Sequence, residues 1–598
     1  MTTSTAPAGP IARPVFVRLL SDHAGALAIL SIAIAATALR GLAILHSDGV
    51  AAGAKEQSTA AVLTPVWQSD AWLVAVVAAL LALLQSVSAR PARLALRLML
   101  GGLLALMLAD VVVYSALDTR LSWGRASIYA GHPAMILAFG AEWLGGRGIA
   151  TAAAVAFCAI VMLPLFVRLP AGLGRWRFGL IAAVAAIGTA LCPASTSHLD
   201  RWQRDNILWL NRPNPEHTRY SHPPSYAPPP GSRRELTHAP ERRNVILVVI
   251  ESWSSYQSKA FGGLHDWTPQ LDELSGRALR FDQFYAGGYN TNEGLIDLLG
   301  GARLWLPFAA RGELTHRTER WREMITLPRT FQKAGYHTAF LTSGPRDYTG
   351  KAAWLDAVGV EETEGGEHPF YAGWPRPNFD AAPDEALYKR ALDWLAAPHA
   401  APFFLTLETV STHLPCIDPA TGRHDIEACF RYTDRWTAWF HAELARRGYF
   451  AGGIMLVTGD HRAMVPVSPD EKERFGGGFS GRIPLLVVDQ EQAGGRVIQR
   501  LLHQADLTPS FRHWLGEPLV LDESEASLFE ADDAPGSIIL HRRGRERGWI
   551  DVLTAPDRYG VVRTQGDDTR FTEASGLDSA AQQRILGLIA RERIHWDP

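Results

Sequence analysis

The chain of 598 residues has almost no net charge and very little cysteine. It carries 58 Lys and Arg against 61 Asp and Glu, a formal net charge of -3, and four Cys. A nucleic-acid-binding protein needs an excess of basic side chains to neutralise phosphates, so this balance argues against a nucleic-acid partner. The sequence also lacks internal repeats, which argues against a repeat protein. At this length it is too long for one ordinary domain.

Long apolar runs are abundant, but only in the first part of the chain. Five runs of roughly 17 to 22 residues have the length that a bilayer requires of a helix. They cover residues 24–45, 71–87, 98–117, 150–167 and 178–193. A buried soluble core is the alternative interpretation, and five such runs in succession argue against it. We therefore expect residues 1–194 to form a multi-pass membrane domain.

The distribution of arginine predicts how this domain is oriented. Cytoplasmic loops of membrane proteins are rich in Lys and Arg. The arginines in the segments that would face the cytoplasm are Arg13, Arg18, Arg90, Arg93, Arg97, Arg168, Arg175 and Arg177. Arg120, Arg125 and Arg147, in the third loop, weaken this asymmetry. With five spans, everything after Pro193 lies outside the cytoplasm, and the first span can serve as an uncleaved anchor.

Two charged residues lie within the predicted spans. Arg40 is near the outer end of the first span and can extend its guanidinium to the interface, whereas Asp110 is deeper and needs a polar partner or a wet cavity. Residues 195–242 are predicted to be an extracytoplasmic linker with the Pro-rich stretch HPPSYAPPPGS. The preceding LDRWQRDNILWLNR has the pattern of an amphipathic helix on the outer membrane surface, or of one packed on a soluble domain.

Residues 243–598 alternate short apolar runs with helical patterns, which predicts an α/β domain with a largely parallel sheet. The runs NVILVVI, HTAFLTS, PFFLTLE, GGIMLVTGD and IPLLVVD are the expected core strands. Continuous Val, Ile and Leu suit strands that are covered by helices on both faces. Sites in such sheets lie beyond the carboxyl ends of the strands.

Acidic and imidazole side chains follow two of these expected strands. Glu251 comes directly after NVILVVI, and Asp460 and His461 follow GGIMLVTG. Each group taken alone has an ordinary explanation, a solvated Glu at a strand end and an Asp-His pair in a loop. Because two strand ends carry such groups, we expect Glu251, Asp460 and His461 to be metal ligands.

A candidate nucleophile lies between these two strands in the sequence. ALRFDQFYAGGYNTNEGLIDLLGG is typical of a strand, a Gly-rich turn and a helix that begins near Asn292, so Thr291 is expected at a helix N-terminus. Free N–H groups there favour a phosphate. Helix capping is the alternative role for Thr291. A Thr hydroxyl becomes a competent nucleophile when a divalent metal helps it lose its proton.

These motifs together resemble a known family. ESW, TPQLDEL, NTNEGL, LPRTFQKAGYHTAFL, STHLP, TGDHR and RIPLLV occur in this order behind the apolar segment. The chain is similar to the lipoteichoic acid synthase and phosphoglycerol transferase group of the sulfatase-like alkaline phosphatase superfamily. The resemblance implies a five-span membrane domain followed by a sulfatase-like α/β domain, whose largely parallel central sheet is sandwiched by helices.

The resemblance also implies roles for individual residues. Glu251, Thr291, Asp460 and His461 match the single-metal site of the family, with Mn²⁺ as the expected ion and Zn²⁺ or Mg²⁺ as alternatives, and Thr291 as the phosphorylated nucleophile. His413 matches a histidine that contacts the substrate phosphate. Trp354 resembles a substrate-contacting Trp. Asp356 replaces the arginine of the family two residues later, which leaves the donor headgroup open.

The implied function is transfer of a glycerol phosphate headgroup from phosphatidylglycerol, or a related phospholipid, to an envelope glycan or polymer. The catalytic domain would face the periplasm or exterior of a bacterial inner membrane. A phosphoethanolamine transferase or a phosphodiesterase of the same fold, and an inactive glycan-binding sensor, are the alternatives. A true sulfatase needs a Cys/Ser-x-Pro-x-Arg motif, which this sequence lacks. A two-zinc phosphatase would need more than His503 and Asp506, for which we expect structural roles.

The cysteines fit the predicted topology. Cys158 and Cys192 lie in predicted spans, and Cys416 and Cys429 lie close together in the exported domain. An oxidising compartment would let Cys416 and Cys429 form a disulfide. Phosphoethanolamine transferases of this layout typically contain more disulfides, so the low count favours phosphoglycerol as the transferred group.

Overall fold

The computed structural model describes residues 15–45, 59–117, 120–121, 163, 204–211, 222–303, 318–399, 402–414, 416–465, 467–478, 480–490, 495–543, 549–564 and 569–596. Contacts divide the chain into two compact units, residues 1–213 and residues 214–598. The Pro-rich part of the predicted linker therefore belongs to the second unit. The limits of the three predicted domains otherwise remain predictions.

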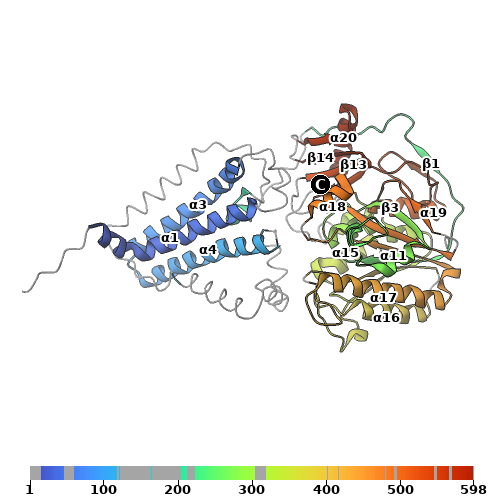
Figure 1. Ribbon diagram of the computed structural model, residues 1–598, viewed down its shortest axis with the longest axis horizontal. Helices are drawn as coiled ribbons and strands as arrows, with labels where there is room; N and C mark the ends of the chain where they lie inside the picture. Colours follow the sequence, from blue (N-terminus) through green and yellow to red (C-terminus); the bar gives the residue numbers. More distant parts are fainter. Residues whose placement is uncertain are drawn as a thin grey trace, which may run out of the picture. The chain divides into compact units, whose positions relative to one another are not determined.

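The first unit contains three long apolar helices, α1 (Val15–Leu45), α3 (Thr59–Ser86) and α4 (Arg90–Leu117) (Figure 1). Segments Gly25–Leu45, Leu63–Leu84 and Arg90–Tyr114 within them are long and apolar enough to cross a membrane. They correspond to the first three predicted spans. The fourth and fifth predicted spans, 150–167 and 178–193, lie outside the described residues.

Buried charges within this unit are paired. Arg120 donates two hydrogen bonds to Asp110 Oδ2, at 3.0 and 2.7 Å, so Asp110 has the polar partner that its depth requires. Arg40 forms an ion pair with Asp70 and also donates to the carbonyl oxygen of Asp205 at 2.7 Å. These pairs account for the two charges that the sequence places within spans.

The predicted amphipathic segment forms a short helix, α10 (Ile207–Leu210), that packs on the three long helices. Ile207 is buried among their apolar side chains. Asn206 donates from its side-chain amide to the carbonyl of Ser69 at 2.8 Å, and the ring of Trp209 lies 5.6 Å from that of Trp72. The sequence predicted a helix on the outer membrane surface or one packed on a soluble domain, so packing of this helix on the three long helices was not predicted.

The second unit is built on a mixed sheet of nine strands among the described residues, in the order β10-β3-β8-β7-β2-β6-β4-β5, with β9 beside β3. The short outer strands are β5 (Glu362–Glu364), β9 (Arg496–Ile498) and β10 (Leu502–His503). The central strands are β2 (Asn244–Ile250), β6 (Phe403–Glu408), β7 (Gly453–Gly459) and β4 (His337–Thr342), which run parallel to one another. β8 (Arg482–Val488) is antiparallel to both its neighbours, β7 and β3 (Leu279–Tyr285). All five expected core strands are present, and most pairings are parallel.

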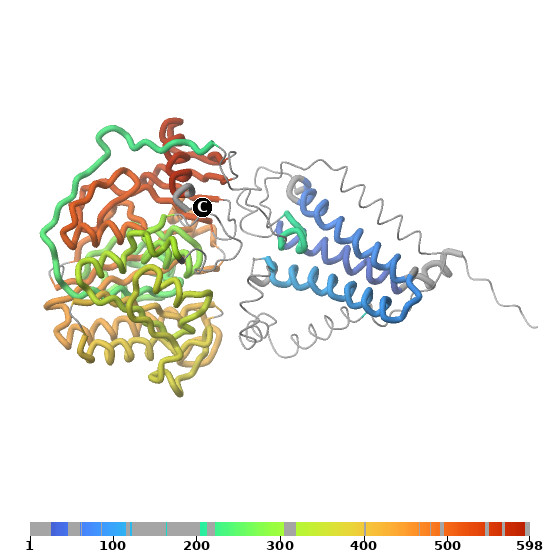
Figure 2. Tube along the Cα trace, turned by 180° about the vertical axis from the view of Figure 1, so that it is seen from behind, coloured from blue at the N-terminus to red at the C-terminus, as the bar shows by residue number. Residues whose placement is uncertain are grey.

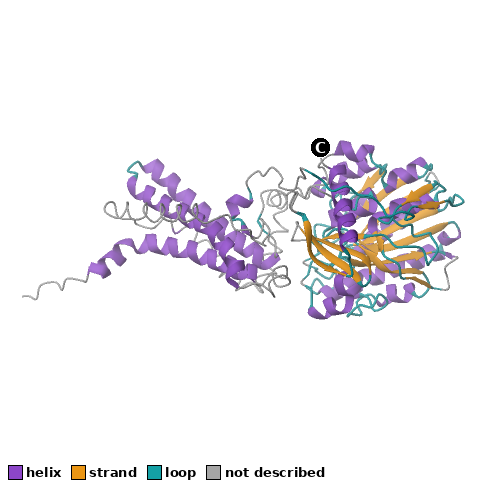
Figure 3. Cartoon of the chain, turned by 90° about the horizontal axis from the view of Figure 1, so that it is seen from above, coloured by secondary structure: helices purple, strands orange, loops and turns teal. Residues whose placement is uncertain are grey.

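Alternation along β2 explains its continuous apolar sequence. Val245, Leu247 and Val249 face one core, and the intervening residues face another on the opposite side of the sheet. Figure 3 shows helices on both faces of the strands. The first core is covered by α12 (Thr291–Gly300), α14 (Leu327–Lys333), α15 (Lys351–Val358) and α19 (Leu507–Trp514). The second is covered by α11 (Pro269–Ser275), α16 (Asp384–Ala396) and α17 (Ile426–Arg446).

The end of the chain forms a smaller antiparallel sheet, β12 (Ile539–Arg542), β13 (Trp549–Ala555), β14 (Arg558–Arg563) and β15 (Arg570–Ser575), covered by α20 (Ser579–Trp596). The segment before β2, green in Figure 2, runs along the outside of this unit. Tyr226 packs beside the core of the small sheet, and β1 (Arg234–Leu236) pairs with β11 (Leu519–Leu521). The chain before β2 is thus attached to the second unit at Tyr226, within the Pro-rich stretch, and at β1, just after it.

Candidate active site

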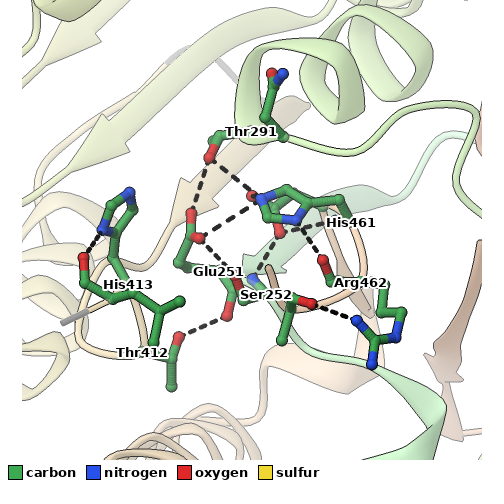
Figure 4. Close-up of polar contacts among 12 residues, drawn as sticks. Glu251, Ser252, Thr291, Thr412, His413, His461 and Arg462 are labelled. Atoms are coloured by element: carbon green, nitrogen blue, oxygen red, sulfur yellow. Dashed lines mark hydrogen bonds and ion pairs between the residues drawn. The ribbon is translucent and has the colours of Figure 1, made fainter. Parts of the chain in front are cut away.

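The register of the sheet brings the predicted ligands together. Ile250, the last residue of β2, lies opposite Gly459, the last residue of β7. Glu251 and the Asp460-His461 pair therefore leave the same edge of the sheet. Figure 4 shows Glu251 beside His461. His461 Nε2 is 3.6 Å from Glu251 Oε1 and 3.3 Å from Asp460 Oδ2, and all three side chains are buried.

Thr291 reaches this group from the first residue of α12. Its Oγ1 donates to Glu251 Oε2 at 3.0 Å and lies 3.5 Å from His461 Nε2. The helix is capped by Asn290, whose side chain accepts from the N–H of Glu293. Capping is therefore not the role of Thr291, and its hydroxyl points toward the carboxylates instead (Figure 4).

A network of hydrogen bonds fixes the two carboxylates. Ser252 donates from its backbone N–H to Asp460 Oδ1 and from its hydroxyl to Glu251 Oε1, both at 2.7 Å. The backbone N–H of His461 donates to the same Asp460 oxygen at 2.8 Å. Asp460 Oδ2, by contrast, has no hydrogen-bond partner among the described residues although it is buried. A buried carboxylate oxygen without a donor is costly unless a cation or a proton compensates it.

Burial and mutual charge set the protonation of this group. Burial raises the pKa of Asp460 well above its usual range, and the negative charge of Glu251 adds to that. Burial opposes the charged form of His461, but the charges of Asp460 and Glu251 raise its pKa to about 9. For Glu251, hydrogen bonding to His461 outweighs burial and lowers the pKa below its usual range. In the absence of a cation the site therefore retains protons, which a bound metal would displace.

The donor set suits a divalent metal. It offers two carboxylates, one imidazole and one hydroxyl, which are ligands for Mn²⁺, Mg²⁺ or Zn²⁺. The N–H at His461 Nδ1 donates to the carbonyl oxygen of Arg462 at 2.7 Å, so Nε2 faces the site and offers its lone pair once a metal displaces the proton there. The orphaned Asp460 Oδ2 lies on the same side. These residues fit the ion that the sequence predicts.

His413 lies in the loop after β6, next to Glu251 (Figure 4). Its ring packs 4.2 Å from that of Phe379, and Thr412 donates to the carbonyl oxygen of Glu251 at 2.5 Å. The loop is thus tied to the end of β2. The predicted contact of His413 with a substrate phosphate remains a prediction.

Trp354 is fully buried, so in this structure its side chain is not available for the substrate contact that the resemblance implies. Its side chain is 0 % exposed and lies in the core, edge-on to Trp321 with 5.8 Å between the ring centroids. Asp356 points to the surface and forms an ion pair with Arg322 at 2.6 Å. The helical spacing on α15 places one residue in the core and the other in solvent.

The predicted disulfide is also absent, since Cys416 and Cys429 are not bonded to each other. Cys416 has a positive φ of 62°, and its Sγ donates to the carbonyl oxygen of Thr412 at 3.7 Å. Cys429 is buried in the first turn of α17. Proximity in sequence was therefore not sufficient to predict a disulfide.

His503 and Asp506 have the structural roles expected for them. His503 accepts from the N–H of Ala505 at 3.0 Å, and Asp506 pairs with Arg303 and accepts from Ser537 at 2.6 Å. Gln504, between them, donates to the carbonyl oxygen of Asp460 at 2.7 Å and so supports the strand end that carries the ligands.

Several residues that shape the site could not be recognised from sequence patterns. Ser252, Thr349 and Phe379 all have positive φ angles, of 60°, 55° and 51°. Thr349 donates to Asn292, next to Thr291, at 3.2 Å, and Phe379 packs on His413. Strained non-Gly residues cluster at functional sites because the surrounding fold must hold them there. Backbone strain of this kind cannot be read from residue types.

A buried ion pair lies in the same region and was also missed. Lys351 Nζ is 2.6 Å from both carboxylate oxygens of Glu408, the last residue of β6, and both side chains are almost fully buried. The pair joins the start of α15 to the edge of the sheet that carries the candidate site.

The architecture of the second unit is also found in a protein of known structure. The fold is shared with a protein in the alkaline phosphatase superfamily from Vibrio parahaemolyticus, at a TM-score of 0.50 and 18% identity, covering 62% of this chain and 92% of that one. Residues 243–517 also match the family model described as Sulfatase. This part of the chain therefore resembles a sulfatase-family domain, and it shares its fold with the superfamily protein named above.

Two other solved structures are similar at lower scores. The lipoteichoic acid synthase LtaP from Listeria monocytogenes has a TM-score of 0.45 and 16% identity, over 62% of this chain and 95% of that one. The C-terminal periplasmic domain of EcEptC from Escherichia coli has a TM-score of 0.37 and 15% identity, over 53% and 93%. No curated protein matches the sequence.

Proposed function

We propose that this protein is a membrane-anchored, metal-dependent phosphotransferase that moves a glycerol phosphate headgroup from phosphatidylglycerol to an envelope glycan or polymer. The observation that carries the proposal is the hydrogen bond of Thr291 Oγ1 to Glu251 Oε2, at 3.0 Å, beside His461 and Asp460. A hydroxyl at a helix N-terminus, facing a buried cluster of metal-binding side chains, is suited to attack a phosphodiester.

Glu251, Asp460, His461 and Thr291 would hold the metal. When bound, the metal would lower the pKa of the Thr291 hydroxyl and neutralise negative charge on the phosphoryl oxygens. Thr291 Oγ1 then forms a bond to phosphorus while the bond to the diacylglycerol oxygen breaks, and the proton lost by Thr291 finally resides on diacylglycerol. In the second half, an acceptor hydroxyl attacks phosphorus, the bond to Thr291 Oγ1 breaks, and the hydroxyl of Thr291 is restored.

The proposed role of the chain's own residues is to position these groups. Glu251 Oε2 accepts the hydrogen bond of Thr291 and orients its oxygen. His413, on the loop beside Glu251, would contact the phosphoryl oxygens. The N-terminal N–H groups of α12 would face the same negative charge.

A lipid donor fits an anchored enzyme, because the donor is confined to the bilayer. Three helices able to span a membrane are found among the described residues. Both three and five spans are odd numbers, so with either count the sulfatase-like domain would lie on the side of the membrane opposite to the N-terminus, which the arginine distribution predicts to be cytoplasmic. We propose a bacterial inner membrane location with this domain in the periplasm.

The decisive experiment traps the covalent intermediate. The purified full chain is incubated in detergent with Mn²⁺ and phosphatidylglycerol, without an acceptor, and the peptide containing Thr291 is analysed by mass spectrometry. A phosphoglycerol adduct is expected on Thr291 in the parent, and none in Thr291→Val, which keeps the side-chain size but lacks the hydroxyl. Equal headgroup release by the parent and Thr291→Val would refute the proposal.

The same experiment separates the rival donors. With phosphatidylethanolamine in place of phosphatidylglycerol, no adduct is expected on Thr291. A phosphoethanolamine adduct would keep the phospho-threonine chemistry but assign the other headgroup. Release of headgroup to water without transfer to any glycan would indicate a phosphodiesterase.

A further inference from the structure

A second group of potential metal ligands lies at the opposite edge of the sheet. His337 is the first residue of β4, Glu362 is the first residue of β5 (Glu362–Glu364), and His399 follows α16. Since β4 runs parallel to β2 in this sheet, its start lies at the amino edge, whereas Glu251 follows the carboxyl end of β2. We call His337, Glu361, Glu362 and His399 the edge cluster.

The geometry of the edge cluster is that of a metal site. One ligand atom from each of His337, Glu362 and His399 lies within 4.8 Å of the others. His337 Nε2 is 2.9 Å from Glu362 Oε2, and His337 Nδ1 is 3.2 Å from Glu361 Oε2. A neutral imidazole has one N–H, so only one of these contacts can be a hydrogen bond. At the other contact, a lone pair of the imidazole nitrogen would face a lone pair of the carboxylate oxygen, unless a second proton or a cation lies between them.

The outer contacts of these side chains are those of bound ligands. Trp394 donates from Nε1 to Glu362 Oε1 at 3.0 Å, which leaves Oε2 facing His337. The Nε2–H of His399 donates to the carbonyl oxygen of Trp394, which leaves the lone pair of Nδ1 available. Metal-binding His and carboxylate side chains typically have their second polar atom engaged in this way, because it fixes tautomer and orientation.

Aromatic packing holds the same groups in place. The ring of His399 stacks on Trp394 with 3.7 Å between the centroids, and the His337 ring is nearly parallel to that of His399 at 6.3 Å. Trp394 is buried in the core. The cluster therefore rests on a rigid support, while its polar atoms stay accessible, with His337 25% and Glu362 35% exposed.

We propose that the edge cluster binds a divalent metal of the Zn²⁺ class through His337, Glu362 and His399, with the Glu361 carboxylate beside it. Two imidazoles favour Zn²⁺, Ni²⁺ or Cu²⁺, whereas one imidazole with two carboxylates also suits Mn²⁺ or Mg²⁺ at the candidate active site. Three protein ligands leave one position for water. The bound metal joins β4, the edge strand β5 and the segment after α16, and so stabilises this end of the sheet.

Metal content tests the proposal without reference to activity. The full chain in detergent is stripped with a chelator, dialysed against buffered Zn²⁺ and assayed for Zn²⁺ per chain. His399→Ala and Glu362→Gln should each hold one Zn²⁺ fewer than the parent, whether or not the candidate active site is filled. Their affinity for this ion should fall at least about 10- to 100-fold, the loss that an outer contact alone produces. His424→Ala, an exposed histidine outside the cluster, should match the parent.

A second measurement covers folding defects. Zn²⁺ should raise the thermal unfolding midpoint of the parent and of His424→Ala by more than that of Glu362→Gln, which keeps the size of the side chain and an acceptor for Trp394. If Glu362→Gln and His399→Ala hold as much Zn²⁺ as the parent, or gain the same shift in midpoint, the edge cluster is a hydrogen-bonded network and the proposal is refuted.

Discussion

The substitution Gly294→Ala tests how the helix that carries Thr291 is positioned. Gly294 lies one turn into α12 and packs directly on the backbone of Asp460. A Cβ added at Gly294 would lie 2.7 Å from the carbonyl carbon of Asp460, and closer still to its oxygen. Ordinary carbon–carbon contacts are about 3.5–4.0 Å. The obstacle is backbone, so rotation of a side chain cannot relieve it.

The size of the effect follows from this distance. To accommodate the methyl group, α12 must move away from Asp460 by about 1 Å. Thr291 Oγ1 is now 3.0 Å from Glu251 Oε2, and the same movement would lengthen that contact beyond hydrogen-bond range. A misplacement of about 1 Å can cost about 100-fold in rate. Overpacking should also reduce the free energy of unfolding by about 1–3 kcal/mol.

The assay compares headgroup release from phosphatidylglycerol, metal content and thermal unfolding for the parent, Gly294→Ala and Gly452→Ala. Gly452 is in the same domain, has a negative φ of -144°, and has nothing within 4 Å of an added Cβ. Gly452→Ala should retain parental activity. Gly294→Ala should lose about 100-fold while it remains folded. Parental turnover in a folded Gly294→Ala protein would refute the inference that this contact sets the position of Thr291.

Three further predictions concern buried charges. Glu251→Gln keeps the side-chain size but removes an anionic ligand, so metal content should fall and turnover should drop on the order of 1,000-fold. Circular dichroism should show that the fold is intact. A variant that keeps both its metal and its activity would contradict the role of Glu251 as a ligand. Lys351→Met leaves Glu408 buried without its partner, so the free energy of unfolding, measured by chemical denaturation, should fall by about 3–5 kcal/mol. Adding Glu408→Gln should recover most of this lost stability. If the double variant recovers none, the loss does not come from the unpaired charge of Glu408. Burial raises the pKa of Asp434 to about 7, so between about pH 4 and 7 the folded state holds a proton that the unfolded state has lost, and stability should decline with rising pH in this window. Asp434→Asn should remove this part of the pH dependence, and identical pH profiles for the parent and the variant would contradict it.

The sequence predicted the elements of the fold well where the pattern is local. The run 244–250 is buried on both faces of a sheet, and the change from apolar to acidic residues at Glu251 marks the end of a strand. The Gly-rich turn and the helix that follows located Thr291 at a helix N-terminus. Such signals survive in the sequence because burial on two faces and helix initiation constrain residue types over a few neighbouring positions.

The orientation of individual side chains could be determined only from the tertiary structure. Trp354 looked like a substrate contact by its place in a motif, but the helix α15 turns it into the core. Cys416 and Cys429 are close in sequence, but they remain free thiols, one at a residue with a positive φ and the other in the first turn of α17. In each case the deciding factor is the direction of a Cβ on an element whose position is set by distant packing.

By itself, the sequence determined that the chain joins apolar helices to an α/β domain, and which acidic, imidazole and hydroxyl residues end its strands or begin its helices. Only the tertiary structure decided that Glu251 and Asp460 are neighbours, because that depends on β2 and β7, about 200 residues apart in the sequence, pairing in register. It also decided that Asn290, and not Thr291, caps α12, which leaves the Thr291 hydroxyl pointing at the carboxylates. Pairing between distant strands and the placement of one side chain within a turn depend on contacts across the whole domain, and no local pattern of residues encodes them.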